Sequence, residues 1–221
     1  MEEKPIHPKK SQATTHKPKP EVYILRDWKE YLGESFLIIF SVLLALVLTE
    51  YFNNLHEKRD TRELLNNIRT ELVSNKKAEQ EQYVYQQNIL KTIDSALKNP
   101  AFMRKIVSDD EFHWKYIIPE GVVNRDLSTV AWDVAKGHNI TTKASFELIS
   151  KLTDIYANQA RIDKVEEKVA AVLLSWESRK TANIHETLIL LRDNYKGWAF
   201  DRAPGLLAKY DEAIKMLDSE K

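Results

Sequence analysis

Histidines, carboxylates and serines are the residues of this chain that could catalyse a reaction or bind a metal. In the sequence they form no recognisable catalytic or metal-binding motif. His56 and Asp60, like Arg59 and Glu63, are spaced i,i+4 in a charged stretch, as paired side chains on a solvated helix are. His185 precedes a glutamate, but no second histidine follows at the spacing of a zinc protease. Zinc needs three or four ligands, and no such set recurs at a recognisable spacing. The sequence therefore predicts neither a catalytic site nor a metal site.

The composition narrows the function classes further. The 221 residues carry a formal net charge of zero, which argues against a dedicated nucleic-acid binder. There is no cysteine, and hence no disulfide, thiolate metal site or thiol nucleophile. The five glycines form neither of the glycine-rich motifs that cradle phosphates. We therefore expect a protein that is not an enzyme and uses no cofactor, metal or nucleic-acid partner.

One segment must position everything else. Ser35 to Thr49 carries no charge, whereas 30% of all residues are charged. As a helix it rises about 22 Å, short of the roughly 30 Å of a bilayer's hydrocarbon core. Trp28 before it and Tyr51 after it match the aromatic belts of spanning helices, and the stretch is apolar on every face. We predict a single transmembrane helix over residues 35–52.

Two other interpretations of this stretch stay open. A buried core helix of a soluble protein is also apolar, but residues 37–48 leave no polar stripe for water apart from Ser41. A cleaved signal peptide ends at a small-residue cleavage site. Here some 35 residues precede the apolar run, and Thr-Glu-Tyr-Phe follows Leu48. We expect an uncleaved anchor.

One face of the predicted span carries small and polar residues. Ser41 and Ala45 form a small-xxx-small pair, which lets helices approach closely in lipid. Glu50 points nearly the opposite way and is a candidate intramembrane acid. The alternative is that both flanking glutamates are ordinary interfacial charges. The face predicted to pack on a neighbouring helix comprises Glu34, Ser41, Ala45 and Thr49.

Around the span the chain divides into four further segments. Residues 1–20 combine lysines and prolines at a net charge of +3, which indicates a disordered basic tail able to touch anionic headgroups. Residues 21–34 show helical periodicity and predict a juxtamembrane amphipathic helix. Residues 53–99 predict a stalk helix that continues from the span and stops at Asn99-Pro100. Residues 100–221 are expected to form a helical domain that packs on the stalk.

A heptad repeat is the clearest pattern in that domain. Gln159 and Glu166 are its polar members. It favours antiparallel packing against the stalk helix within one bundle, with an intermolecular coiled coil as the alternative. The predicted seam residues are Leu148, Leu152, Ile155, Ile162, Val169, Leu173 and Trp176.

Cap and stop residues predict the helix boundaries. Ser128 is expected to cap a helix over residues 129–136, and Thr141 or Thr142 to cap the next. Gly197 is expected to interrupt the helix that follows, and Pro204-Gly205 to start the last one.

Several phrases resemble a known family. They are the run from Trp28 through the apolar stretch to Glu50-Tyr51, the phrase Arg69-Thr-Glu-Leu72, and Ala131-Trp132-Asp133 followed by Gly137. Together they look like a bacterial family of short single-pass membrane-anchored helical proteins with no assigned function. The resemblance implies a prokaryotic membrane protein and transfers no catalytic residues.

The sequence thus predicts an all-α protein, in which one N-terminal transmembrane helix continues into a long stalk helix and then an antiparallel helical bundle. The basic tail favours a cytoplasmic N terminus in a bacterial inner membrane and a periplasmic helical domain. We expect a membrane-anchored scaffold or interaction protein, an oligomer or an accessory subunit, whose partners are lipid and itself or another membrane protein. The alternatives are a sensory or ligand-binding module, and a pore or ion-pathway subunit that uses Glu34 or Glu50.

Overall fold

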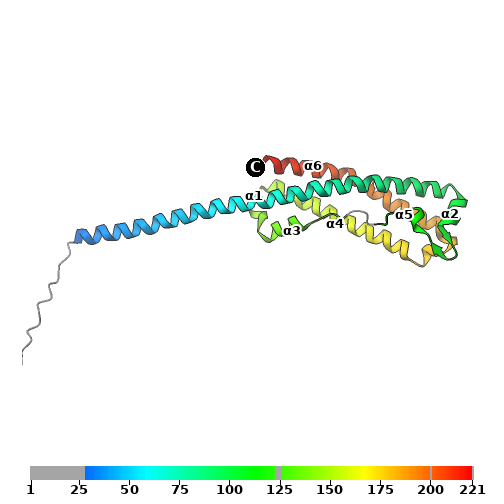
Figure 1. The fold of residues 1–221 in the computed structure, drawn as a ribbon, viewed down its shortest axis with the longest axis horizontal. Helices are drawn as coiled ribbons and strands as arrows, with labels where there is room; N and C mark the ends of the chain where they lie inside the picture. Colours follow the sequence, from blue (N-terminus) through cyan, green and yellow to red (C-terminus); the bar gives the residue numbers. More distant parts are fainter. Residues whose placement is uncertain (1–27, 123–125, 200, 221) are drawn as a thin grey trace, which may run out of the picture. The chain divides into compact units, whose positions relative to one another are not determined.

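The computed structural model describes residues 28–122, 126–199 and 201–220, and in these residues the protein is all-α. Its only strands there are two short ones, β1 (Val107–Ser108) and β2 (Glu111–Phe112), which pair antiparallel. Four short 3₁₀ helices occur, η1 (Trp114–Tyr116), η2 (Ile140–Thr142), η3 (Glu177–Arg179) and η4 (Thr181–Asn183). The α-helices are α1 (Trp28–Leu97), α2 (Pro100–Ile106), α3 (Val130–Gly137), α4 (Phe146–Leu174), α5 (Ile184–Ala199) and α6 (Ala203–Ser219) (Figure 1).

The chain divides into two compact units, Met1–Phe52 and Asn53–Lys221. In the first unit, the described residues from Trp28 onward are helical throughout. The predicted tail over 1–20 lies outside the described residues, as does the first half of the predicted juxtamembrane helix over 21–34. The described part of that segment is the beginning of α1.

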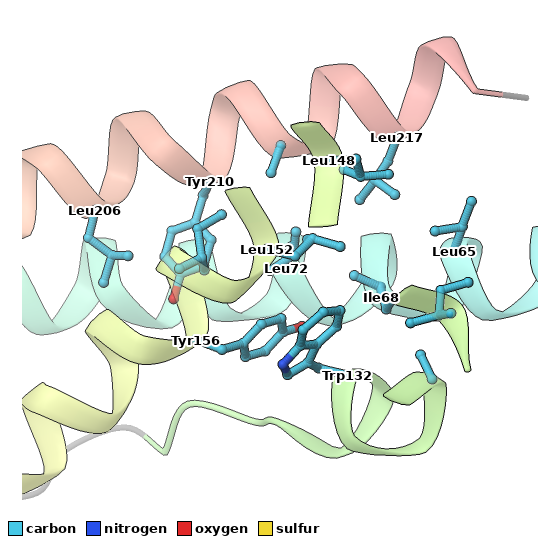
Figure 2. Close-up of a cluster of buried hydrophobic side chains, with 14 of the residues drawn as sticks. Leu65, Ile68, Leu72, Trp132, Leu148, Leu152, Tyr156, Leu206, Tyr210 and Leu217 are labelled. Atoms are coloured by element: carbon cyan, nitrogen blue, oxygen red, sulfur yellow. The ribbon is translucent and has the colours of Figure 1, made fainter. Parts of the chain in front are cut away.

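In the second unit, two clusters of buried apolar side chains hold the helices together. The first joins α1 to α3, α4 and α6 through residues such as Ile68, Leu152 and Tyr210 (Figure 2). The second joins the end of α1 to α2, the strands, the end of α4 and α5, with Ile93 and Leu188 at its centre. The same helix, α1, therefore contributes to both clusters.

Helix α4 runs parallel to α1. Tyr156 contacts Glu71, and Glu166 lies 3.4 Å from Gln82, so the contacts advance together along both helices. The prediction that the seam helix packs antiparallel to the stalk is therefore wrong. The reason is the connection: the chain returns through residues 98–145 to the beginning of the domain before α4 starts (Figure 1).

Helix α6 supplies the antiparallel packing instead. Arg69 of α1 bonds Asp218, with 2.7 Å between Nε and Oδ1, whereas Lys76, further along α1, pairs with the earlier Asp211. Helix α6 is also the principal neighbour of α4. It therefore closes the first apolar cluster from the side opposite α3.

Two of the predicted boundaries agree with the structure. Helix α1 ends at Leu97, and the side chain of Asn99 then accepts the N–H groups of Ala101 and Phe102 at 3.0 and 3.1 Å. Asn99 therefore caps α2, with Pro100 at the first helical position. Helix α3 begins and ends one residue after the predicted 129–136.

Two other boundaries were predicted wrongly. Helix α4 is capped by Ser145, not by Thr141 or Thr142, because the left-handed Asn139 (φ 58°) leads into η2 first. Helix α5 runs through Gly197 to Ala199. A glycine inside a helix costs only about 1 kcal/mol, which the packing of α5 against α4 outweighs.

The predicted seam is buried at six of its seven positions. Trp176 is the exception: its side chain is 78% exposed. Helix α4 ends at Leu174, the backbone of Ser175 is extended, and Trp176 lies beside Arg179, 4.9 Å from guanidinium carbon to ring centroid. The six buried residues are Leu148, Leu152, Ile155, Ile162, Val169 and Leu173.

Candidate functional site

The apolar stretch of α1 is exposed on every face. Its large side chains, from Phe36 (71% exposed) to Leu48 (47%), contact no other element of the described chain closely enough to be buried. Helix α1 is the one described helix with a stretch long and apolar enough to cross a membrane.

The predicted packing face lies on this stretch, with Glu34, Ser41, Ala45 and Thr49 all exposed. The hydroxyl of Ser41 donates to the carbonyl of Leu37 at 2.7 Å, and that of Thr49 donates to the carbonyl of Ala45 at 2.8 Å. Both hydroxyls are thus satisfied within the helix, which is what a lipid environment requires. Glu50, the candidate intramembrane acid, is exposed as well.

A second feature lies inside the helical domain: the buried carboxylate of Glu71. Its Oε2 accepts hydrogen bonds from the Ser128 hydroxyl at 2.6 Å and from the Ala131 N–H at 2.8 Å. Its Oε1 accepts from the Tyr156 hydroxyl at 2.7 Å and from the Trp132 N–H at 3.4 Å. Four donors on two oxygens fit the acceptor-only, ionised form of the side chain.

This arrangement caps α3 from another helix. Thr129, the residue before α3, makes no capping bond to it. Instead the negative charge of Glu71 meets the free N–H groups of the first turn, where the helix dipole favours an anion. Asn75, one turn further along α1, bonds both the N–H and the C=O of Ser128, at 2.9 and 2.7 Å. The loop before α3 is thereby fixed to α1.

Aromatic packing completes this node. The rings of Trp132 and Tyr156 stack with their centroids 5.3 Å apart and their planes within 2° (Figure 2). Burial, and then the hydrogen bond to Glu71, raise the pKa of the Tyr156 phenol well above its usual value. The phenol therefore stays protonated and keeps its role as a donor.

Buried polar side chains lie between the two apolar clusters, beside Tyr83, which packs against both. Gln82 and Gln86 extend the polar stripe of α1 beyond Glu71 and Asn75, and they are 2% and 3% exposed. Gln159 of α4 donates to the phenol oxygen of Tyr210 at 2.6 Å. The side-chain oxygens of Gln82, Gln86 and Gln159 have no hydrogen-bond partner among the described residues.

The residues that could act in catalysis or bind a metal are scattered over the helical domain. His113 lies 2.9 Å from the Ser108 hydroxyl, at the strand pair, and His185 is on α5. Within the described ranges no three histidine, cysteine, aspartate or glutamate side chains gather as metal ligands. The arrangement that the structure does build, around Glu71, orders the helices of the domain, and Glu71 and Ser128 also line a hollow of about 470 Å³.

Sequence reasoning found Glu71 only as part of the phrase Arg69-Thr-Glu-Leu72, not as a buried charge. Its place in the apolar stripe between Ile68 and Leu72 was the available signal. A glutamate one position from a stripe residue in a charged helix is usually solvated, so this signal was weak.

We predict that Glu71→Ala destabilises the domain strongly. The substitution leaves the Ala131 N–H and the Tyr156 hydroxyl buried without an acceptor, at a cost of about 3–5 kcal/mol. Thermal and urea unfolding of the full chain measure the loss. The matched control is Glu63→Ala on an exposed turn of the same helix, which is expected to change stability by less than about 0.5 kcal/mol. Equal effects of the two substitutions would contradict the role given to Glu71.

The buried polar side chains between the two clusters lead to the opposite expectation. Gln86→Leu removes a buried amide oxygen that has no partner, so it is expected to stabilise the protein by about 1–3 kcal/mol. The measurement is the shift in the unfolding midpoint, and the control is Gln80→Leu at an exposed position of the same helix. A loss of stability in Gln86→Leu would mean that the amide makes a net favourable contribution.

Compared with protein-family models, curated proteins and solved structures, the chain matches none of them.

Proposed function

We propose that this protein is a membrane-anchored helical scaffold or interaction protein, in which residues 35–52 span a bilayer and the bundle formed by residues 53–221 binds a partner. The observation that carries the anchor is the exposure of eleven large apolar side chains between Phe36 and Leu48. Leaving such side chains in water costs about 1.5–3 kcal/mol each, so on the order of 20 kcal/mol favours an apolar environment.

The bundle itself supports a binding role more than a catalytic one. Its buried polar groups, led by Glu71, are directed at other helices of the same domain. The apolar stretch of α1 finds no partner within the described chain, and its Ser41 and Ala45 face allows close approach of a second helix. We propose that this helix belongs to a second copy or to another membrane protein.

The resemblance of the sequence to a bacterial family of membrane-anchored helical proteins suggests where the protein resides. We propose the inner membrane, with the basic N-terminal tail in the cytoplasm and the bundle in the periplasm. Lysines in the tail favour that orientation.

The anchor is tested by extraction of membranes with alkaline carbonate. We expect the full chain to stay in the membrane pellet and the double substitution Leu44→Arg, Val47→Arg to release it. Each arginine at the centre of a span costs about 2.5–3.5 kcal/mol on insertion scales. Thr70→Arg, at an exposed position of the bundle, is the control and is expected to stay in the pellet. Release of the unmodified chain from the membrane pellet would contradict the proposed anchor.

The packing face is tested by cysteine crosslinking, which is clean because the chain has no cysteine of its own. We expect Ser41→Cys and Ala45→Cys to form disulfide-linked products in membranes under mild oxidation. Leu43→Cys and Val47→Cys, on the opposite side of the helix, are the controls. Efficient crosslinking from the control positions alone would place the interface elsewhere. Monomer from all four, with no partner in affinity purification, would contradict the interaction role.

A further inference from the structure

A pocket of about 450 Å³ opens at the end of the bundle where α1 enters it. Three arginines of α1 line it, two on adjacent turns and the third two turns further on, together with the last turn of α6. Two leucines, Leu65 and Leu217, form its floor, and they are 9% and 3% exposed because they end the first apolar cluster. The lining arginines are Arg59, Arg62 and Arg69.

The three arginines differ in how far they are already paired. Arg69 forms a two-point bond with Asp218, at 2.7 and 3.2 Å, which orients its guanidinium beside the pocket. Arg59 and Arg62 are exposed, and the described part of the chain gives them neither an ion pair nor a hydrogen bond. Two unpaired guanidinium groups thus face the same hollow.

The acidic residues of the pocket are not paired with Arg59 or Arg62 in the described part of the chain. Glu63 and Glu220 line the pocket together with the arginines. Glu220 accepts a hydrogen bond from Ser145 at 2.8 Å, and Glu63 is exposed. Neither lies within ion-pair distance of an arginine of the pocket. An arriving anion would therefore meet guanidinium groups that are not yet neutralised.

A second hollow of about 440 Å³ lies on the other side of Arg62 and shares Leu65 with the first. Lys143 borders it and is held by Glu57, with 3.2 Å between Nζ and Oε1. Arg62 is therefore open to a ligand from two sides, and an apolar floor lies next to it in both.

The combination identifies the chemistry of the ligand. Guanidinium forks bind phosphate oxygens at two points and are more weakly hydrated than ammonium groups. The apolar floor adds a place for hydrocarbon, which a free phosphate ion does not use. An anion with a phosphate group and an adjoining hydrocarbon part fits both features.

We propose that this pocket binds the headgroup of an anionic phospholipid. The inference rests on the proposed membrane anchor, because Arg59 follows the last residue of the apolar run, Leu48, by only eleven residues. Basic side chains close after a span attract anionic headgroups, at about fivefold in affinity for each lysine or arginine. The lipid, rather than a soluble ligand, is then the phosphate source at highest local concentration.

The test uses the full chain in nanodiscs of phosphatidylcholine containing no phosphatidylglycerol or 30% of it. Lipids that remain bound after transfer to detergent are counted by native mass spectrometry. We expect phosphatidylglycerol to be enriched on the unmodified chain. The double substitution Arg59→Gln, Arg62→Gln is expected to lower that enrichment by about tenfold or more, and 0.5 M NaCl is expected to weaken it. The control is Arg104→Gln, Lys105→Gln, two exposed cations on α2 at the other end of the bundle.

Each outcome has a defined meaning. Equal phosphatidylglycerol enrichment in the unmodified chain and in the arginine double variant would overturn the pocket, as would the same loss in the control variant. Displacement of the lipid by 10 mM inorganic phosphate would identify a site for free phosphate instead. A chain that does not remain in nanodiscs of either composition would overturn the anchor and the pocket together, whereas a retained chain with no lipid preference would overturn the pocket alone.

Discussion

The carboxylate of Glu71 sits inside the helical domain, where a charge is tolerable only if several donors surround it. Those donors come from the loop before α3, from the first turn of α3 and from the middle of α4. One side chain of α1 therefore decides where two later elements must lie. Together with the contact between Gln82 and Glu166, the bond from Tyr156 to Glu71 fixes the parallel register of α4.

The short helix α3 depends on the same interaction. It has eight residues, too few to be stable alone, and no side-chain cap from Thr129. Glu71 accepts the N–H groups of Ala131 and Trp132, and the Ser128 hydroxyl accepts that of Val130 at 3.3 Å. Asn75 holds Ser128 in place, and the rings of Trp132 and Tyr156 stack beside this bond. The interior of the domain is thus specified by polar contacts at one end and by buried polar side chains in its middle, between the two apolar clusters. Polar groups in such places cost stability but exclude alternative registers.

The sequence was informative wherever periodicity alone decides the outcome. Leu148 through Leu173 recur at heptad spacing, and all six are buried because a period of seven keeps one face of a helix toward its neighbours. Periodicity carries no information on direction, so it could not distinguish a parallel partner from an antiparallel one. The heptad spacing also predicted wrongly that Trp176 belongs to the buried seam, because nothing in the local sequence marks the backbone of Ser175 as extended. The sequence did not predict the buried role of Glu71 for a related reason. The residues that donate hydrogen bonds to it lie 57 to 85 positions away in the chain.

Helix α1 keeps one backbone conformation through stretches whose apolar patterns differ. From Glu34 to its end at Leu97 it contains neither proline nor glycine, so no residue interrupts its backbone hydrogen bonds. Only the arrangement of its apolar side chains changes along the helix. They cover every face over residues 36–48, are absent over residues 57–63, and form one stripe from Leu65 onward. These are the patterns suited to lipid, to water and to a protein interior. A helix satisfies its own backbone in all three, and no other backbone conformation does so without neighbouring strands. If the proposed anchor holds, the span and the first helix of the bundle are one continuous helix, so no irregular backbone is needed between them.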